Sequence, residues 1–297
     1  MFALNDYNYD LPEKLIAQKP AKQRDRSKLL FMNRENGELT HHAFLQLYDL
    51  LYPSDILVVN NTEVIPGRLY GQKETGGKAE ILILNYAGRR REGHDDRGIV
   101  CECIIKSSKR PRPGTVIIFD QGLRAEVLGF NNNIYALKFK CQGDFETYLY
   151  QTGKIPLPPY IKRGQANDAF CDDRRSYQTV YASQRGAIAA PTAGLHFTKA
   201  FLEKIKSKGV KIVEITLHIG YATFRPVRVS DIRNHNIHIE WYYVSKAAAE
   251  TINHAKAMER RIIAVGTTCV RTLEFATDNS GQIAFGSGSC DLFIYPG

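Results

Sequence analysis

Hydrophobic and polar positions follow one pattern toward the two ends of the chain and another between them. The unbroken apolar run 56–59 ends at an Asn-Asn pair, as a buried strand does where it meets a turn. Strand-like runs at 211–217 and 261–265 alternate with helical stretches, and Thr198 is a suitable cap for the helix that starts after it. These segments predict α/β structure.

Between residues 64 and 140 the pattern changes to short β-prone runs. Turn formers such as Gly76-Gly77 and the proline-containing segment 110–114 separate them. Several short strands without a helix predict a small barrel. Because α/β texture stands on both sides, we expect an α/β (mixed α+β) main domain with an inserted small β-barrel domain. The expected ranges are 1–63 and 153–297 for the discontinuous α/β domain and 64–152 for the barrel.

The composition is that of a globular protein with excess positive charge. With 297 residues and 43% hydrophobic content, the chain can bury a large core. The formal charge of +9 suits a polyanionic partner but is also common in proteins that bind no nucleic acid. No apolar run approaches the roughly 20 residues of a membrane-spanning helix, and residues 1–10 lack a signal-peptide core. We therefore expect a soluble, cytoplasmic protein.

Cysteine and histidine spacing argues against a bound metal. The six cysteines form no Cys-x-x-Cys pair, so we expect reduced thiols and no iron–sulfur cluster. His235, His238 and Glu240 are metal-capable, yet no third histidine or cysteine at ligand spacing accompanies them. Alternation along a strand would instead place His238 and Glu240 on one face, where the carboxylate orients the ring.

A first candidate ligand-binding turn follows the buried run 187–190, which is expected to be a strand. Such strand-to-helix turns are where α/β folds place ligands. In it, Gly194 permits close backbone approach, the Thr192 hydroxyl can form hydrogen bonds, and His196 lies beside both. A tight structural turn with a half-buried histidine is the alternative.

Two more turns that follow predicted strands are candidates for ligand binding. His218 and Gly220 close a probable strand. The segment Gly266-Thr267-Thr268 leads into a helix with Arg271 and Glu274, an arrangement that directs free backbone N–H groups at an anion. A simple helix cap explains the latter segment equally well without further information.

Basic segments and nearby tyrosines offer an RNA-binding surface. Phosphate contacts require Lys and Arg, and unpaired bases stack on aromatic rings. Basic loops are also ordinary solvated surface. The segments are Arg89 to Arg91, Lys106 to Arg112, Lys162-Arg163 and Arg174-Arg175, with Tyr160 and Tyr177 as stacking candidates.

A series of motifs runs in order from residue 9 to the last residue. It comprises Tyr9-Asp10-Leu11-Pro12, Arg24 to Leu30, Asn60 to Leu69, Ile155 to Ile161, Tyr177 to Tyr181, Ala190 to Thr198, Thr216 to Gly220, His235, His238 and Glu240, Gly266 to Glu274, and Asp291 to Gly297. Together these motifs resemble the S-adenosylmethionine:tRNA ribosyltransferase-isomerase family of queuosine biosynthesis.

The resemblance implies a specific reaction. Members of the family transfer the ribosyl group of S-adenosylmethionine to 7-aminomethyl-7-deazaguanine at the wobble position of a tRNA with a GUN-type anticodon. The product is epoxyqueuosine, and adenine and methionine are released. S-adenosylmethionine is then a consumed substrate, no metal or other cofactor is implied, and a monomer is expected.

The chemistry needs a base, because the donor's sulfonium group acidifies its C5′ protons and removal of one gives an ylide. Histidine is the natural base near neutral pH, and His196, His218, His235 and His238 all remain open for this role. The candidate catalytic residues are His196, His218, His238 and Glu240. The candidate substrate-binding residues are Thr192, Gly194, Gly220, Gly266, Thr267, Thr268, Arg271 and Glu274. The candidate RNA-binding residues are Arg110, Arg112, Arg163 and Tyr177.

The chain departs from the family pattern at several points. Cys269 stands where Ser is usual, and Asn61 and Glu63 stand where Asp and Arg are usual. The family also continues beyond Gly297 with an Asn-Phe-His-Leu-Pro run, so we expect that this chain either omits a tail or lacks part of the active centre.

Two other functions are compatible with parts of the sequence. A non-enzymatic RNA-binding module fits the charge and the barrel but leaves the histidine motifs unexplained. Another S-adenosylmethionine-dependent tRNA-modifying enzyme, such as a methyltransferase, is disfavoured because no glycine-rich loop follows an early strand.

Overall fold

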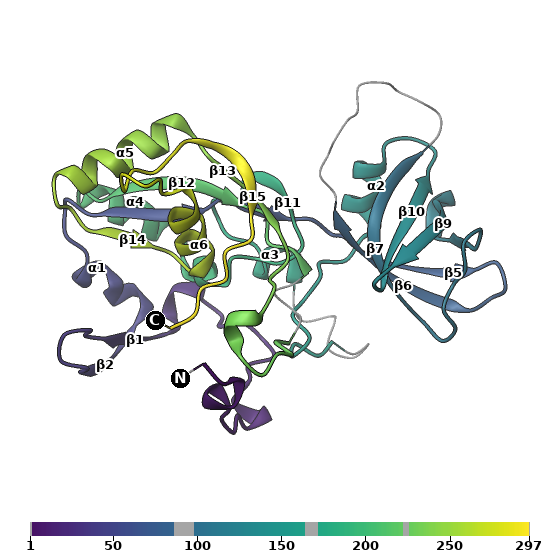
Figure 1. The fold of residues 1–297 in the computed structure, drawn as a ribbon, viewed down its shortest axis with the longest axis horizontal. Coiled ribbons are helices and arrows are strands. Elements are labelled where there is room, and N and C mark those ends of the chain that lie inside the picture. The colour runs from purple at the N-terminus through teal and green to yellow at the C-terminus, as the bar shows by residue number, and fades with distance from the viewer. Residues whose placement is uncertain (1, 86–97, 164–171, 222–225, 297) are drawn as a thin grey trace. The chain divides into compact units, whose positions relative to one another are not determined.

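The protein is described by a computed structural model that covers residues 2–85, 98–163, 172–221 and 226–296 (Figure 1). Its architecture is mixed α/β with a closed antiparallel barrel, so the predicted fold class is confirmed. The chain divides into two compact units. The first contains residues 1–63, 159–184 and 190–297, and the second contains 64–158 and 185–189.

The first unit is built on a five-stranded sheet in the order β14-β3-β12-β13-β15. β14 and β12 both pair with β3 in parallel, whereas β13 and β15 continue the sheet antiparallel. Every residue of β3 is buried, which fits a central parallel strand covered on both faces. The bounds are β14 (Ile262–Ala264), β3 (Ile56–Asn60), β12 (Lys211–Leu217), β13 (Glu240–Val244) and β15 (Gly286–Cys290).

Helices cover the two faces of this sheet. α5 (Lys246–Ala257) and α6 (Thr267–Ala276) pack with Val58 on one face. α4 (Lys199–Ser207) packs with Val59 on the other. The predicted cap of α4 is present, because Thr198 Oγ1 accepts a hydrogen bond from the Phe201 N–H at 3.1 Å.

Shorter elements complete the first unit and its connections. β1 and β2 form an antiparallel hairpin, and β4 pairs with β11 in a separate two-stranded sheet. The strand expected over 187–190 is wrong beyond Ala187, where β11 ends, although all four residues are buried. The bounds are β1 (Lys28–Met32), β2 (Leu39–Ala43), α1 (Leu47–Leu50), β4 (Thr62–Val64), α3 (Asp173–Ser176), β11 (Gln184–Ala187), and the 3-10 helices Leu4–Tyr7, Glu13–Leu15, Arg24–Arg26, Phe44–Gln46, Thr192–His196 (η7) and Ile232–Asn234.

The second unit is a barrel whose strands close in the order β10-β7-β6-β5-β8-β9. Alternate residues point inward, so Ile81, Ile83 and Cys103 are fully buried in its core. α2 (Phe145–Thr152) adds Phe145 and Leu149 to this core, which the strand pattern alone did not predict. The bounds are β5 (Arg68–Lys73), β6 (Lys78–Asn85), β7 (Ile99–Ser107), β8 (Val116–Ile118), β9 (Arg124–Asn131) and β10 (Ile134–Lys140).

Across the described ranges, no helix combines the length and the apolar character needed to span a membrane.

Candidate functional site

The carboxyl ends of the three parallel strands meet at one edge of the five-stranded sheet. Gly266-Thr267-Thr268 follows β14, Asn61-Thr62 follows β3, and His218 begins the segment after β12. In open α/β sheets this edge is where ligands bind. Two of the three turns predicted from the sequence therefore lie on the same sheet edge.

A buried asparagine fixes this edge. The Asn60 side chain is fully buried, and its Nδ2 donates to the Leu217 carbonyl at 3.0 Å. Its Oδ1 accepts from the N–H groups of Leu217 at 3.0 Å and Thr62 at 3.1 Å. The side chain thus completes the backbone hydrogen bonds where β3 and β12 end.

Asn61, one of the departures from the family pattern, is also fully engaged. Its Oδ1 accepts from the Thr216 hydroxyl at 2.7 Å, and its Nδ2 donates to Glu214 at 3.1 Å. These contacts tie it to β12, so its side chain has a structural role here.

The third predicted turn joins the same edge. Gly266 has a φ of +84°, and a Cβ built on it would lie 3.2 Å from the Cβ of Ala193. Ala193 belongs to η7, so the 192–196 turn lies against the turn between β14 and α6. Within η7, Thr192 is exposed, Gly194 is buried and His196 is half-buried.

Three buried hydroxyl groups near these turns lack hydrogen-bond partners among the described residues. They are Thr179 Oγ1, Tyr181 Oη and Thr268 Oγ1. A Cβ built on Gly194 would lie 2.0 Å from Tyr181 Oη and 3.0 Å from Thr179 Cγ2, which explains why this position is glycine. An unsatisfied buried polar group costs about 1–3 kcal/mol. These hydroxyls are therefore suited to a polar ligand or water.

Tyr181 stays protonated, because burial raises the pKa of its hydroxyl well above its ordinary value. It is a hydrogen-bond donor at every physiological pH. Tyr181 lies in the motif Tyr177 to Tyr181, but the sequence alone gives it no role. No local pattern could indicate a role for Tyr181, because the burial of its hydroxyl depends on Gly194, thirteen residues later in the chain.

His218 is held on two sides. Its Nδ1 is hydrogen-bonded to Thr62 Oγ1 at 2.7 Å, and its ring stacks on Trp241 with a centroid distance of 5.0 Å. Burial lowers the pKa of His218 from 6.5 to about 4. The ring is therefore neutral near pH 7.

His196 is held by the N-terminal part of the chain. Its Nδ1 is hydrogen-bonded to Ser27 Oγ at 2.7 Å, and its ring lies against Phe44 at 5.2 Å. Thr198 Oγ1 also donates to Asp25 at 3.2 Å. The Arg24 to Leu30 motif thus positions the segment that carries His196.

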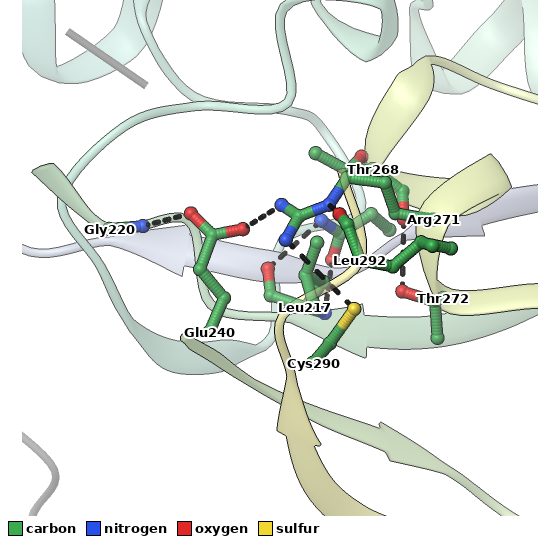
Figure 2. Close-up of polar contacts among 9 residues, drawn as sticks. Leu217, Gly220, Glu240, Thr268, Arg271, Thr272, Cys290 and Leu292 are labelled. Atoms are coloured by element: carbon green, nitrogen blue, oxygen red, sulfur yellow. Dashed lines mark hydrogen bonds and ion pairs between the residues drawn. The ribbon is translucent and has the colours of Figure 1, made fainter. Parts of the chain in front are cut away.

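Glu240 and Arg271 form a buried ion pair (Figure 2). Glu240 Oε1 accepts from the Gly220 N–H at 2.7 Å, and Arg271 Nε donates to the Leu292 carbonyl at 2.8 Å. Burial raises the pKa of Glu240, and Arg271 and the Gly220 N–H oppose that shift. Glu240, Arg271 and Gly220 are thus brought together, but their polar groups bind one another and the Leu292 carbonyl.

The remaining α/β candidates are more exposed. His238 precedes β13 and is exposed, so the expected alternation with Glu240 along a strand is wrong. Both oxygens of Glu240 instead accept from Gly220 and Arg271. Thr267 and Glu274 are exposed on α6.

Of the four candidate RNA-binding residues, two are exposed and two are engaged by the protein itself. Arg110 and Arg112 are exposed in the barrel unit. Arg163 is bound to Asp173 through two hydrogen bonds, at 2.8 and 3.1 Å. Tyr177 is buried, which raises the pKa of its hydroxyl to about 12. The prediction that its ring stacks on a base is wrong for this conformation, because the ring is packed inside the protein.

Some expectations concern residues that lie outside the described ranges, namely Arg89 to Arg91 and Cys171. The five described cysteines are free thiols. In the described part of the chain, no three His, Cys, Asp or Glu residues are placed to hold a metal ion.

We predict that His218 makes the stability of the protein depend on pH between about 6.5 and 4. The unfolded chain binds a proton at His218 that the folded protein does not, so stability falls as the pH falls through this window. Lowering the pKa from 6.5 to about 4 corresponds to a loss of roughly 3 kcal/mol. Chemical denaturation at pH 7 and pH 4 should show a larger loss for the wild type than for His218→Phe. Equal losses would contradict a neutral, half-buried His218.

Comparison with known proteins places the chain in a family. Residues 4–297 match the family described as "Queuosine biosynthesis protein". The S-adenosylmethionine:tRNA ribosyltransferase-isomerase of Syntrophotalea carbinolica is 47% identical over 295 residues, which cover 99% of this chain and 83% of that protein. The protein of the same name from Desulfitobacterium hafniense is 46% identical over 299 residues, with the same coverage.

A crystal structure of S-adenosylmethionine tRNA ribosyltransferase from Thermotoga maritima is 29% identical to this chain. The alignment covers 98% of this chain and 79% of that one, with a TM-score of 0.46. On the match of almost its whole length, the chain belongs to the queuosine biosynthesis protein family.

Proposed function

We propose that this protein is an S-adenosylmethionine:tRNA ribosyltransferase-isomerase. It transfers the ribosyl group of S-adenosylmethionine to 7-aminomethyl-7-deazaguanine at the wobble position of a tRNA with a GUN-type anticodon. The group is rearranged to give epoxyqueuosine, and adenine and methionine leave. The names of relatives 43–47% identical over 99% of the chain support this proposal.

The observation that carries the proposal is the set of unpaired hydroxyls at the carboxyl edge of the sheet. Thr179, Tyr181 and Thr268 present neutral hydroxyl groups in a buried setting. Such groups can both donate to and accept from ribose hydroxyls, and they can donate to a carboxylate. The donor offers both chemical groups. We therefore assign the ribosyl and methionyl parts of the donor to this edge.

The start of α6 suits the carboxylate of the methionyl part. Gly266 is the N-cap of this ten-residue helix, and its positive φ turns the chain from β14 into the helix. The first N–H groups of a helix favour an anion. Ala193 packs against Gly266, which brings the His196-bearing turn to the same place.

Of the two well-placed histidines, His218 is poorly suited to act as the base. A general base works best when its pKa lies near the working pH. Burial lowers the pKa of His218 to about 4, which keeps it neutral but makes it a weak base. We assign proton removal from C5′ to His196 and positioning to His218. Ser27 then fixes the orientation of the His196 ring through Nδ1.

The reaction needs no metal or redox cofactor in this proposal, because the sulfonium group already activates the C5′ protons and provides methionine as a leaving group. We further propose a cytoplasmic monomer. Arg110 and Arg112 on the barrel unit supply phosphate contacts for the tRNA.

Product analysis tests the function. The protein is incubated with precursor-modified tRNA and S-adenosylmethionine labelled in the ribose, with and without EDTA. We expect label on the tRNA, release of adenine and methionine, and no effect of EDTA beyond tRNA folding. Release of S-adenosylhomocysteine would indicate a methyltransferase instead. Binding of tRNA with no transfer would indicate an RNA-binding module.

The assignment of the base predicts different defects for two histidine variants. His196→Ala should lower turnover by about 10²–10⁴-fold and abolish exchange of the donor's C5′ protons with solvent. His218→Ala should retain that exchange, measured by NMR of the donor in deuterated buffer. His254→Ala, on the exposed side of α5, is the matched control and should behave as the wild type.

The opposite pattern would overturn the assignment. If only His218→Ala loses exchange while both variants melt normally, His218 is the base. If His196→Ala melts at a lower temperature but its folded fraction turns over normally, His196 is structural.

A further inference from the structure

An open aromatic surface lies on the sheet face opposite α5 and α6. Trp241 and Tyr243 occupy alternate positions of β13, so their rings project from the same face. They are 43% and 44% exposed. The two rings are nearly parallel, with an interplanar angle of 8° and a centroid distance of 6.3 Å. We call Trp241 and Tyr243, together with their β15 neighbours Ser287 and Ser289, the stacking patch.

The neighbours of the two rings leave them accessible. In the register of β13 and β15, Trp241 lies opposite Ser289 and Tyr243 lies opposite Ser287. Both serines are exposed. Side chains this small cannot cover an aromatic ring on the adjacent strand. The intervening Tyr242 points to the other face, where its ring packs edge-on against Phe275 of α6.

The stacking patch continues directly into the proposed active site. The His218 ring stacks on Trp241 at 5.0 Å and 21°, which extends the ring column to three members. His218 is in turn hydrogen-bonded to Thr62 at the carboxyl edge of the sheet. A flat ligand on the stacking patch therefore lies in the same column of rings as a residue of that edge.

We propose that the stacking patch binds an unpaired base of the RNA substrate. Aromatic rings at alternate positions of a sheet are a common platform for single-stranded RNA, because every base has a π face. The serine hydroxyls beside the rings can form hydrogen bonds with base edges or a ribose 2′-hydroxyl. The net charge of +9 favours approach of the polyanion.

The openness of the surface decides against the donor's adenine as the occupant. Small-molecule sites bury about 70–90% of their ligand, whereas Trp241 and Tyr243 in the stacking patch are both open to solvent over more than 40% of their surface. An RNA base needs no enclosure, because the rest of the strand binds elsewhere. The inference rests on the proposed function in one respect, namely that RNA is the substrate.

The fluorescence of Trp241 reports directly on binding at the stacking patch, because Trp241 is the only tryptophan in the chain. The intact protein is titrated with an unmodified anticodon stem-loop RNA, which binds without turnover, and separately with S-adenosylmethionine. We expect the RNA to quench Trp241 emission saturably, with the same midpoint as binding measured by anisotropy of labelled RNA. The donor alone should leave most of the emission unchanged.

Variants of the second ring give the energetic test. Tyr243→Ala should weaken RNA binding by about 5- to 100-fold, in line with the loss of one base–aromatic stack. Tyr243→Phe retains the ring and should bind within about twofold of the wild type. Tyr52→Ala removes a tyrosine that is more exposed, at 58%, and far from β13 in sequence, and it serves as the control. Circular dichroism and thermal melts confirm that the variants are folded.

Several results would overturn the inference. One is RNA affinity of Tyr243→Ala within twofold of the wild type. Another is quenching by the donor but not by RNA, which would assign the patch to adenine. The product analysis separates this failure from that of the proposed function. If the wild type transfers ribose while Tyr243→Ala binds RNA normally, only the proposed role of the stacking patch is wrong. If RNA quenches Trp241 emission but no ribose is transferred, only the proposed function is wrong.

Discussion

The buried ion pair of Glu240 and Arg271 is the interaction on which the site depends most (Figure 2). Removing two charges from water costs several kcal/mol each, and only close pairing with further hydrogen bonds offsets that cost. Gly220 and Leu292 supply those hydrogen bonds. Glu240 therefore links the segment after β12 to β13, and Arg271 links α6 to the segment after β15. The turn that carries His218 and the turn that opens α6 are held by the same pair.

A second constraint on the site comes from two glycines at which another segment of the chain packs closely against the backbone. Gly194 leaves room for the Tyr181 hydroxyl, and Gly266 combines a positive φ with contact to Ala193. A side chain at either position would push apart segments that the ion pair does not connect. Segments far apart in the chain, near Ser27, Thr179, His196 and Thr268, therefore pack around one edge of the sheet, where the unpaired hydroxyls are found.

Local sequence patterns predicted what depends on local structure. β12 occupies the predicted range 211–217, and Thr198 caps α4 as expected, because strand periodicity and capping are properties of short segments. The three candidate turns were recognisable for the same reason. The turns after β12 and β14 converge because both strands run parallel to β3, whereas the 192–196 turn reaches them through the contact of Ala193 with Gly266.

What the sequence could not predict depends on tertiary contacts. Glu240 and Arg271 are 31 residues apart, and neither has a local signal for pairing. Glu240 was expected to orient His238, but β13 begins only at Glu240 itself. Tyr177 looked like a surface aromatic residue because it follows basic residues, yet its ring is buried. The local sequence does not single out Trp241 and Tyr243, because their accessibility depends on the small residues of β15 beside them.

We propose that the buried hydroxyls at the sheet edge lack protein partners because S-adenosylmethionine pairs with them. Isothermal titration of S-adenosylmethionine into wild type and Tyr181→Phe, with unfolding of each free protein measured alongside, can test this pairing. We expect Tyr181→Phe to bind the donor about 3- to 10-fold more weakly, as for one lost hydrogen bond, and to have an unfolding free energy that is unchanged or higher. Equal donor affinity together with a lower unfolding free energy would contradict it, because the hydroxyl would then serve the fold and not the ligand.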